Sequence, residues 1–482
     1  MSNLYLICSI CLFQFVHIQA QDIIDVTYVR TFTTLQANFI KVALGLTVPV
    51  EHNVDLYKVE YTTTGSDMRL DTASGLFMIP VDYTQSMPIA CYQHGTTDGR
   101  DVVPSNFNSF FEIGAVLASN GMAVVAPDFL GMGSSRGFHP YVHAETEATA
   151  AVDMIRALQT YMAENELAWN KQLFITGYSQ GGHAAMALHK YIEEEIPGEF
   201  QVTASLPMSG PYSLSGVMID LAFGNEEFNF PSYLVYSSRG LKEIHPDLYN
   251  DESELFKEEF LDDIYRFTTT GNGTTELNLD LVEALLINYG AVLPGLIFKD
   301  SVLQVLQSQP EHPFNLALKE SDLYDWTPQA PVYMLYCEGD DQVPFRNTII
   351  ADSTMNARGA IDVSSKEVSG GRDLDHGQCA IPALNEGIPW LLSFMQTTPT
   401  TDIIKIAGLR LAPNPADQNF TIQSEQTIEK LLITDLSGRT YEIGNGANSN
   451  FNIDTHDWAS GMYLMYLSTE VGVEVRKVII QH

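Results

Sequence analysis

Apolar and polar residues alternate along residues 54–80, which is the pattern of strands that bury one face and expose the other. The alternating apolar positions are Val54, Leu56, Val59, Tyr61, Leu70, Ala73, Leu76 and Met78. This pattern predicts an antiparallel hairpin at the start of a sheet.

Farther along the chain, short apolar runs alternate with segments of helical periodicity. The apolar runs predict strands at residues 88–93, 122–128, 172–176, 202–208, 331–337 and 361–368. Helices are predicted at residues 106–119, 145–167, 183–190, 346–358 and 380–395. The second of these helices places Ala148, Val152, Ile155, Leu158 and Met162 on one face. Strands that alternate with helices form a mainly parallel sheet, so the expected fold class is α/β.

Residues 212–328 break this rhythm, because they separate two predicted strands by far more than an ordinary crossover connection. Apolar residues recur at helical spacing within the segment, at Leu255, Phe256, Phe260, Ile264, Phe267, Leu281, Ala284, Leu285, Ala291 and Val292. We therefore expect a helical cap inserted above the sheet, whose apolar stripes also form the cap's own core. Pro294 and Gly295 interrupt the apolar run, so it does not predict a transmembrane helix.

The N-terminal segment differs from the α/β pattern. Residues 4–20 are apolar and uncharged, and polar sequence begins at Gln21. This predicts a signal peptide over residues 1–20 that is cut near Ala20. A membrane anchor is the alternative, although the run is short for a span.

The C-terminal segment also differs. Residues 396–402 are rich in Thr and Pro and predict a linker, which leaves residues 21–395 as the main body. Short strands and turns fill residues 403–482, with hairpins expected at 428–443 and 461–480. This pattern predicts a small all-β sandwich.

The composition limits the classes of partner. The chain has 482 residues, with 25 basic and 60 acidic side chains and a net charge of −35. So negative a chain is not expected to bind nucleic acid or an anionic membrane surface, and polyanionic substrates are disfavoured. No Cys/His metal spacing is present, and neither a metal nor a cofactor is expected.

The stretch of residues 177–182 (Gly-Tyr-Ser-Gln-Gly-Gly) carries the strongest chemical signal. It lies between a predicted strand and a predicted helix, which is the setting of a nucleophile elbow. Glycines two residues before and two after Ser179 relieve crowding at such a sharp turn. Ser179 is therefore the expected nucleophile, with its oxygen near a helix N-terminus that favours an oxyanion.

An acid and a base follow in the order that this architecture requires. Asp340 and Asp341 come just after the strand at 331–337, and the spacing Asp-x-x-Val-Pro favours Asp340 as the acid. Either acid could instead cap the next helix. His376 follows the last predicted strand in a Gly-rich loop and is the expected general base; the alternative is a surface loop histidine.

The loop after the strand at 88–93 is expected to complete an oxyanion hole. Such a hole needs one N–H from the residue after the nucleophile and one from an earlier strand-to-helix loop. The backbone N–H groups of Gln180 and Thr96 are the expected donors. His94 is expected to be a hydrogen-bonded structural residue, and His183 to pack or hydrogen-bond locally.

Residues 88–395 resemble the α/β-hydrolases, more narrowly the secretory lipase and esterase group. The resemblance rests on residues 92–96 (Tyr-Gln-His-Gly-Thr), 126–133 (Ala-Pro-Asp-Phe-Leu-Gly-Met-Gly), 151–157 (Ala-Val-Asp-Met-Ile-Arg-Ala) and 177–182. It implies a carboxylic ester hydrolase with an inserted lid and a triad of Ser179, Asp340 and His376. The doubled acid departs from the family pattern, so Asp341 stays an alternative.

Residues 403–482 resemble the C-terminal sorting domain of the type IX secretion system of Gram-negative bacteria. The resemblance rests on residues 413–416 (Pro-Asn-Pro-Ala), 435–439 (Asp-Leu-Ser-Gly-Arg), 461–464 (Gly-Met-Tyr-Leu) and 477–480 (Lys-Val-Ile-Ile). It implies export through the periplasm to the cell surface or the medium, with the secretion machinery as a partner. A carbohydrate-binding sandwich is the alternative, but no planar aromatic strip supports it.

After removal of a signal peptide the chain would keep Cys91, Cys337 and Cys379. Cys337 lies three residues before Asp340 and Cys379 three after His376, so a bridge forms if those loops meet; buried free thiols are the alternative.

Two further functions stay open at this point. Amide and ester cleavage share the same machinery, so a serine peptidase of the same fold is one. A catalytically inactive homologue that binds a surface is the other. Neither the acyl chain nor the alcohol of an ester substrate can be read from the sequence.

Overall fold

The computed structural model describes residues 22–108, 111–396, 406–435, 440–469 and 472–482. These residues form two compact units, of which the first ends at Gln396 and the second contains the C-terminal strands. The predicted signal peptide and residues 397–402 of the predicted linker lie outside the described residues.

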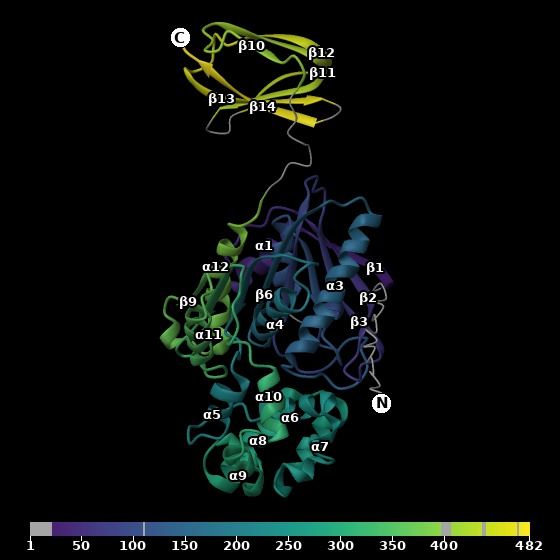
Figure 1. The fold of residues 1–482 in the computed structure, drawn as a ribbon, viewed down its shortest axis with the longest axis vertical. Helices are drawn as coiled ribbons and strands as arrows, with labels where there is room; N and C mark the ends of the chain where they lie inside the picture. Colours follow the sequence, from purple (N-terminus) through teal and green to yellow (C-terminus); the bar gives the residue numbers. More distant parts are fainter. Residues whose placement is uncertain (1–21, 109–110, 397–405, 436–439, 470–471) are drawn as a thin grey trace, which may run out of the picture. The chain divides into compact units, whose positions relative to one another are not determined.

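A nine-stranded sheet forms the centre of the first unit, in the order β1-β2-β3-β5-β4-β6-β7-β8-β9 (Figure 1). The strands are β1 (Ile23–Phe32), β2 (Val54–Thr64), β3 (Leu70–Pro80), β4 (Met87–Gln93), β5 (Ala123–Pro127), β6 (Trp169–Tyr178), β7 (Val202–Met208), β8 (Val332–Tyr336) and β9 (Val363–Glu367). In this order, neighbouring strands from β1 to β5 pair antiparallel. Neighbouring strands from β5 to β9 pair in parallel. The structure thus confirms the predicted hairpin and the mainly parallel sheet.

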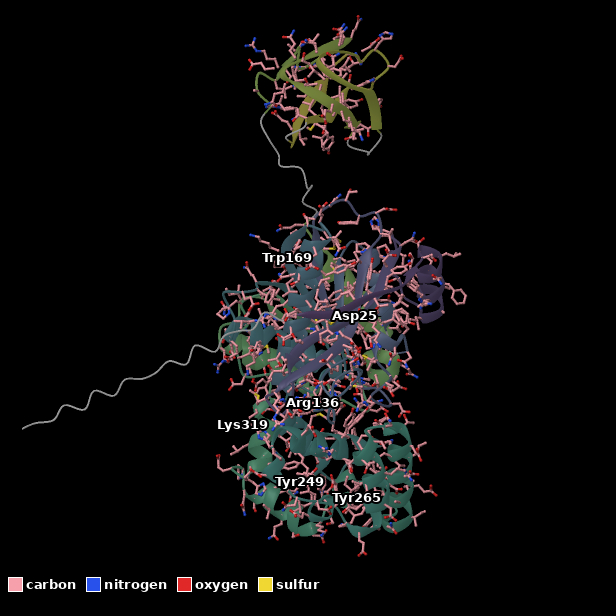
Figure 2. All side chains as sticks on the ribbon, turned by 90° about the vertical axis from the view of Figure 1, so that its right-hand side faces the viewer. Asp25, Arg136, Trp169, Tyr249, Tyr265 and Lys319 are labelled. Carbon is pink, nitrogen blue, oxygen red and sulfur yellow. A yellow bond between two sulfur atoms is a disulfide. The ribbon has the colours of Figure 1, made fainter. Side chains whose placement is uncertain are left out.

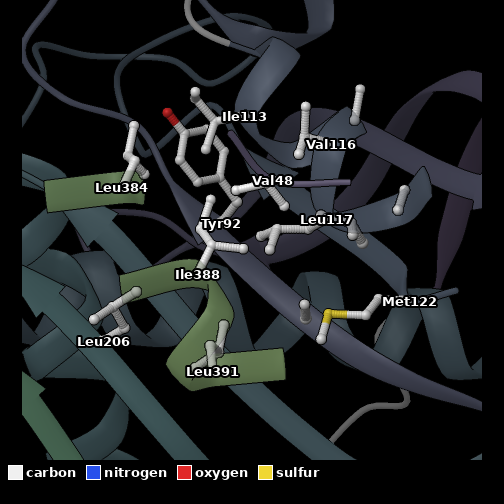
Figure 3. Close-up of a cluster of buried hydrophobic side chains, with 14 of the residues drawn as sticks. Val48, Tyr92, Ile113, Val116, Leu117, Met122, Leu206, Leu384, Ile388 and Leu391 are labelled. Carbon is white, nitrogen blue, oxygen red and sulfur yellow. The ribbon is translucent and has the colours of Figure 1, made fainter. Parts of the chain in front are cut away.

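Helices cover both faces of this sheet. On one face lie α1 (Thr34–Leu44), α2 (Phe111–Ser119) and α12 (His376–Leu392), and on the other α3 (Ala144–Glu164), α4 (Gln180–Glu194) and α11 (Arg346–Ala357). Alternate residues of β4 supply the two cores, with Ala90 and Tyr92 in one and Ile89 and Cys91 in the other. Figure 3 shows part of the first core, where Leu384, Ile388 and Leu391 of α12 face side chains of α2.

A helical cap is inserted between β7 and β8. It comprises α5 (Ile219–Ala222), α6 (Ser232–Ile244), α7 (Leu261–Thr270), α8 (Thr274–Tyr289), α9 (Asp300–Ser308) and α10 (Pro313–Glu320), which gather at one end of the sheet (Figure 1). The cap has its own apolar core, which includes Phe256, Phe260, Ile264, Leu281 and Leu285. None of the helices in the described part of the chain has the length and apolar character that a membrane crossing requires.

The second unit is an antiparallel sheet built from β10 (Arg410–Ala412), β11 (Asn419–Asp435), β12 (Thr440–Asp454), β13 (Gly461–Thr469) and β14 (Gly472–Ile480). The long strand β11 pairs with β12 on one edge and with both β10 and β13 on the other. Its buried side chains, among them Phe420, Ile422 and Leu431, form a core with Met465 and Val478. The two predicted hairpins are present, at β11–β12 and β13–β14.

Two elements of the first unit, β1 and α1, were not predicted from the sequence. β1 is an edge strand whose side chains are mostly exposed, so residues 23–32 carry no clear alternation of apolar and polar positions. Tertiary pairing with β2 makes it a strand.

A disulfide joins the C-terminal end of β8 to the first turn of α12. Cys337 and Cys379 are bonded, with a Cα–Cα distance of 6.0 Å and a separation of 42 residues. Both side chains are fully buried, whereas Cys91 is a buried free thiol in the central strand β4. The loops after β8 and before α12 therefore meet, which the sequence left open.

Replacing both Cys337 and Cys379 by Ala is expected to lower the free energy of unfolding by about 4 kcal/mol, because the bridge closes a loop of 42 residues and restricts the unfolded chain. Denaturant titration of the full chain measures this loss. Reductant should destabilise the natural chain and leave the double variant unchanged. Equal stability of the two proteins would contradict the prediction.

Candidate active site

Ser179 occupies a strained turn between β6 and α4. Its backbone has φ 62° and ψ −125°, and its N–H donates to the carbonyl of Met208 on β7 at 3.0 Å. A Cβ at Gly177 would lie 2.1 Å from the carbonyl oxygen of Gly181, and a Cβ at Gly181 would lie 2.1 Å from that of Gln93. Both glycines are therefore required for the strand and the helix to approach so closely, which leaves Ser179 at the carboxyl end of the central strands.

Asp340 follows β8 and is held in place by its own loop. Its Oδ1 accepts hydrogen bonds from the backbone N–H groups of Gln342, at 3.0 Å, and Val343, at 2.8 Å. Its Oδ2 lies 2.7 Å from Nδ1 of His376, and both side chains are almost fully buried. The backbone thus fixes one carboxylate oxygen and aims the other at the imidazole.

Asp341 contacts the same histidine in a different way. Its Oδ1 accepts from the backbone N–H of His376 at 3.1 Å. One acid therefore holds the ring of His376 and its neighbour holds the main chain. This geometry favours Asp340 over Asp341 as the partner of the imidazole.

His376 is the first residue of α12, where the sequence suggested a loop position. Asp375 caps this helix and forms a capping box with Gln378. The hydroxyl of Tyr178 donates to the carbonyl of His376 at 2.6 Å, and their rings lie 5.0 Å apart. Because Tyr178 precedes Ser179 directly, this contact joins the serine turn to the histidine.

The second ring nitrogen of His376 is available for chemistry. Nε2 is buried and has no hydrogen-bond partner among the described residues. A carboxylate at Nδ1 stabilises the tautomer with the proton on Nδ1, which leaves a lone pair on Nε2. This is the form in which an imidazole accepts a proton from a hydroxyl group.

The expected oxyanion donors lie on two segments that meet at the serine. Gln180 is the first residue of α4, so its N–H is one of those without a partner inside the helix. Gly95 lies so close to the serine turn that a Cβ there would be 3.3 Å from the carbonyl of Tyr178 and 3.8 Å from Cβ of Ser179. Thr96 comes next in this loop, and its hydroxyl is hydrogen-bonded to Tyr141 Oη at 2.8 Å.

His94 shapes this loop. It is fully buried, its Nδ1 lies 2.8 Å from the carbonyl oxygen of Gly95, and its ring packs on Phe129. Burial lowers the pKa of His94, so the ring is neutral at ordinary pH. These contacts favour a structural role.

A buried polar network orients Gln180; the sequence predicted only local contacts for one member, His183, whose partners are in fact distant in the chain. Nε2 of the Gln180 amide lies 2.7 Å from His139 Nε2 and donates to Glu147 Oε1 at 3.1 Å. Glu147 Oε2 in turn lies 2.7 Å from His183 Nδ1, whose Nε2 faces the carbonyl of Ser321 in the cap-to-body connection. Burial lowers the pKa of His139 to about 3, so this ring is neutral and can accept from the amide. Gln180 and His183 lie on α4, whereas the other members come from separate segments, so no single spacing pattern marks the network.

An apolar cavity opens directly onto Ser179 and Gln180. Its volume is about 80 Å³. The cap supplies most of its wall, including Leu214, Met218, Leu221, Phe223, Leu234 and Phe298. The arrangement can hold an apolar chain with one end at Ser179, beside the N-terminus of α4.

Two known families match separate parts of the chain. The alpha/beta hydrolase family matches residues 94–367, which is more than half of the sequence. The secretion system C-terminal sorting domain matches residues 410–481, within the second unit. No curated protein matches the chain.

Several solved structures share the fold of the first unit. A protein of Legionella pneumophila described as a hydrolase is 26% identical, with a TM-score of 0.68 over 77% of this chain and 98% of its own. The rice cell wall degrading esterase LipA of Xanthomonas oryzae is 23% identical, with a TM-score of 0.68 over 78% of this chain and 99% of its own. Candida antarctica lipase A is 18% identical, with a TM-score of 0.59 over 78% of this chain and 82% of its own.

Residues 410–481 of the second unit match the secretion system C-terminal sorting domain, which indicates the type IX secretion route. The first unit has the sheet order, the serine turn and the family match expected of a hydrolase. The chain therefore belongs to the alpha/beta hydrolase family and carries a secretion system sorting domain at its C-terminal end.

Proposed function

We propose that the protein is a secreted carboxylic ester hydrolase that works through an acyl-enzyme on Ser179. The observation that carries the proposal is the hydrogen bond of 2.7 Å between Asp340 and His376, which Tyr178 links to a positive-φ serine that lines an apolar cavity. Two structural neighbours are named as an esterase and a lipase, which supports ester chemistry.

The reaction follows from the positions of these groups. Ser179 Oγ attacks the ester carbonyl while Nε2 of His376 takes the hydroxyl proton. The carbonyl oxygen becomes an oxyanion, which the N–H groups of Thr96 and Gln180 stabilise. When the tetrahedral intermediate collapses, His376 returns the proton to the departing alcohol and the acyl group stays on Ser179.

The second half repeats the same steps with water. Water loses a proton to His376 as it attacks the acyl carbonyl, and the proton then returns to Ser179 as the carboxylic acid leaves. Asp340 keeps its two backbone N–H donors and stabilises the imidazolium that forms. No metal or cofactor takes part in these steps.

The cavity favours an ester over a peptide. Its cap wall consists mainly of aliphatic and aromatic side chains that suit an acyl chain. A peptide backbone would bring N–H and C=O groups into this apolar space without partners, at a cost for each unpaired group.

Ser179→Ala is expected to reduce the turnover of nitrophenyl esters about a million-fold, because the residue supplies the attacking oxygen. Circular dichroism should show an unchanged fold. Labelling with a fluorophosphonate should occur in the natural chain and disappear in the variant. Near-normal hydrolysis by Ser179→Ala would refute the proposal, including the choice of an active enzyme over an inactive homologue.

Asp340→Asn should lower kcat about ten-thousand-fold, because an amide stabilises the wrong tautomer of His376. Asp341→Asn is the matched control, and it should cost about tenfold or less because one hydrogen bond to a backbone N–H is weakened. Steady-state kinetics on one nitrophenyl ester compares the two. If the larger loss belonged to Asp341, that residue would be the triad acid.

The apolar cavity predicts a preference for longer acyl chains. Each buried methylene contributes about 0.8 kcal/mol, so kcat/KM should rise roughly fourfold per methylene up to the length of the cavity and then fall. Nitrophenyl esters from acetyl to decanoyl measure the profile, beside a triglyceride and a peptide amide. A flat profile would show that the cap does not bind the acyl chain.

A matched pair of variants locates this preference. Leu221→Trp fills the cavity from the cap side and should move the optimum to shorter chains. Leu286→Trp makes the same change at an exposed position on α8 and should leave the profile unchanged. An equal response of both variants would place the acyl site elsewhere.

Deletion of residues 403–482 is expected to leave an active, soluble enzyme that stays in the periplasm of a Gram-negative host with type IX machinery. The reason is that the described triad residues and the central sheet lie in the first unit, whereas the sorting domain forms the second. Immunoblots and esterase assays of periplasm and medium measure the outcome.

Fusion of residues 403–482 to an unrelated periplasmic protein provides the complementary experiment, and it should carry that protein out of the cell. Normal secretion of the truncated chain would contradict the sorting role. Loss of polysaccharide binding with unchanged secretion would favour a carbohydrate-binding domain instead.

A further inference from the structure

Three side chains that can bind a metal ion meet away from the serine. His143 directly precedes α3, His245 directly follows α6, and Glu320 is the last residue of α10. One potential ligand atom of each lies within 4.8 Å of those of the other two. In a tetrahedral zinc site, ligand atoms at about 2.0–2.1 Å from the ion lie roughly 3.3–3.5 Å apart. Small side-chain rotations would therefore bring all three into coordination.

Two of the potential ligand atoms already lie close together, at a hydrogen-bond distance that is shorter than the separation in a zinc site. His245 Nε2 lies 2.9 Å from Glu320 Oε2. Their side chains are 33% and 53% exposed, so an ion can reach them from solvent, whereas His143 is buried. Among the ion pairs of the described residues, Glu320 has His245 as its partner and no Lys or Arg. The carboxylate charge is thus not neutralised by a permanent cation.

His143 has a neighbour that orients its ring for metal binding. Nδ1 lies 3.1 Å from Thr146 Oγ1, and this hydroxyl donates to the carbonyl of His143 at 3.1 Å. The backbone N–H of Thr146 donates to the same Nδ1 at 3.4 Å, so the ring also caps α3. Metal binding through Nε2 would place the ring proton on Nδ1, where Thr146 Oγ1 can accept it in place of this capping bond.

The cluster lies where the cap meets the body. Glu320 and His245 belong to the cap, whereas His143 belongs to the body. Ser321 Oγ accepts a hydrogen bond from the N–H of Ala144 at 3.1 Å, so the two segments are in direct contact here. Figure 2 shows Lys319, the neighbour of Glu320, at this junction.

We propose that His143, His245 and Glu320 bind a zinc ion that fastens the cap to the body, with water completing the coordination. Two imidazoles and one carboxylate suit zinc, whereas calcium and magnesium prefer oxygen ligands. A simple ion pair would account for His245 and Glu320, but not for the convergence of His143 from a third segment. The site is separate from the serine and does not depend on the proposed ester hydrolysis.

The test is zinc titration of the full chain, purified through a tag without histidine and stripped with a chelator. Calorimetry should show one zinc ion bound per chain, and no binding of calcium at the same concentration. Zinc at a hundredfold excess over its Kd should raise the melting temperature by roughly 3–8 °C, because it binds only the folded chain.

Three variants assign the site. His245→Gln, Glu320→Gln and His143→Asn should each weaken zinc binding at least tenfold and abolish the thermal shift; Asn at position 143 can still cap α3. Glu283→Gln changes an exposed acid on α8 in the same cap and should bind zinc like the natural chain. Absence of zinc binding, or unaltered binding in His245→Gln and Glu320→Gln, would overturn the proposal. Calcium binding equal to that of zinc would overturn the metal assignment.

Discussion

The serine turn between β6 and α4 is the constraint on which the rest of the first unit depends. Ser179 has a backbone conformation that costs on the order of 1–3 kcal/mol for a residue other than glycine. The surrounding structure must hold it there, because nothing local favours it. Hydrogen bonding of its N–H to β7, together with the close approach that Gly177 and Gly181 allow, supplies that restraint. The buried parallel strands thus hold this one strained residue in its conformation.

The acid and the base reach this turn through two connected loops. Backbone N–H groups fix Asp340, Asp341 holds the main chain at His376, and the disulfide joins the two loops covalently. Tyr178 then links the histidine to the serine turn through its hydroxyl. Because each restraint acts on backbone rather than on a flexible side chain, the imidazole has little freedom to leave its position. Such preorganisation is what makes a hydrogen-bonded pair useful in catalysis.

The cap forms the wall of the proposed substrate cavity and also contacts the body near the serine. Apolar side chains of the cap helices form the core of the cap and most of the cavity wall. Packing of the cap core therefore also determines the shape of the proposed acyl-binding cavity. The return of the cap to the body passes Ser321, which contacts Ala144 and His183. From His183 the polar network continues through Glu147 to Gln180 beside the serine. The proposed zinc ligands lie at the outer end of this same connection.

The sequence by itself determined the elements and much of the chemistry. Period-two patterns and buried runs specified the strands, helical stripes specified the cap, and the Gly-x-Ser-x-Gly turn between a strand and a helix specified the proposed nucleophile. These features are local, since each depends on residues a few positions apart. The edge strand β1 was missed for the same reason, because its exposed residues carry no local pattern.

Only the tertiary structure decided which distant groups meet. In the folded chain Asp340 contacts the ring of His376, and Asp341 accepts from its backbone N–H. Cys337 is bonded to Cys379, and distant side chains form the network around Gln180. It also brought His143, His245 and Glu320 together from three segments that are far apart in the chain. Such contacts are set by how the helices and strands pack, and packing distances between distant segments leave no spacing pattern in the sequence.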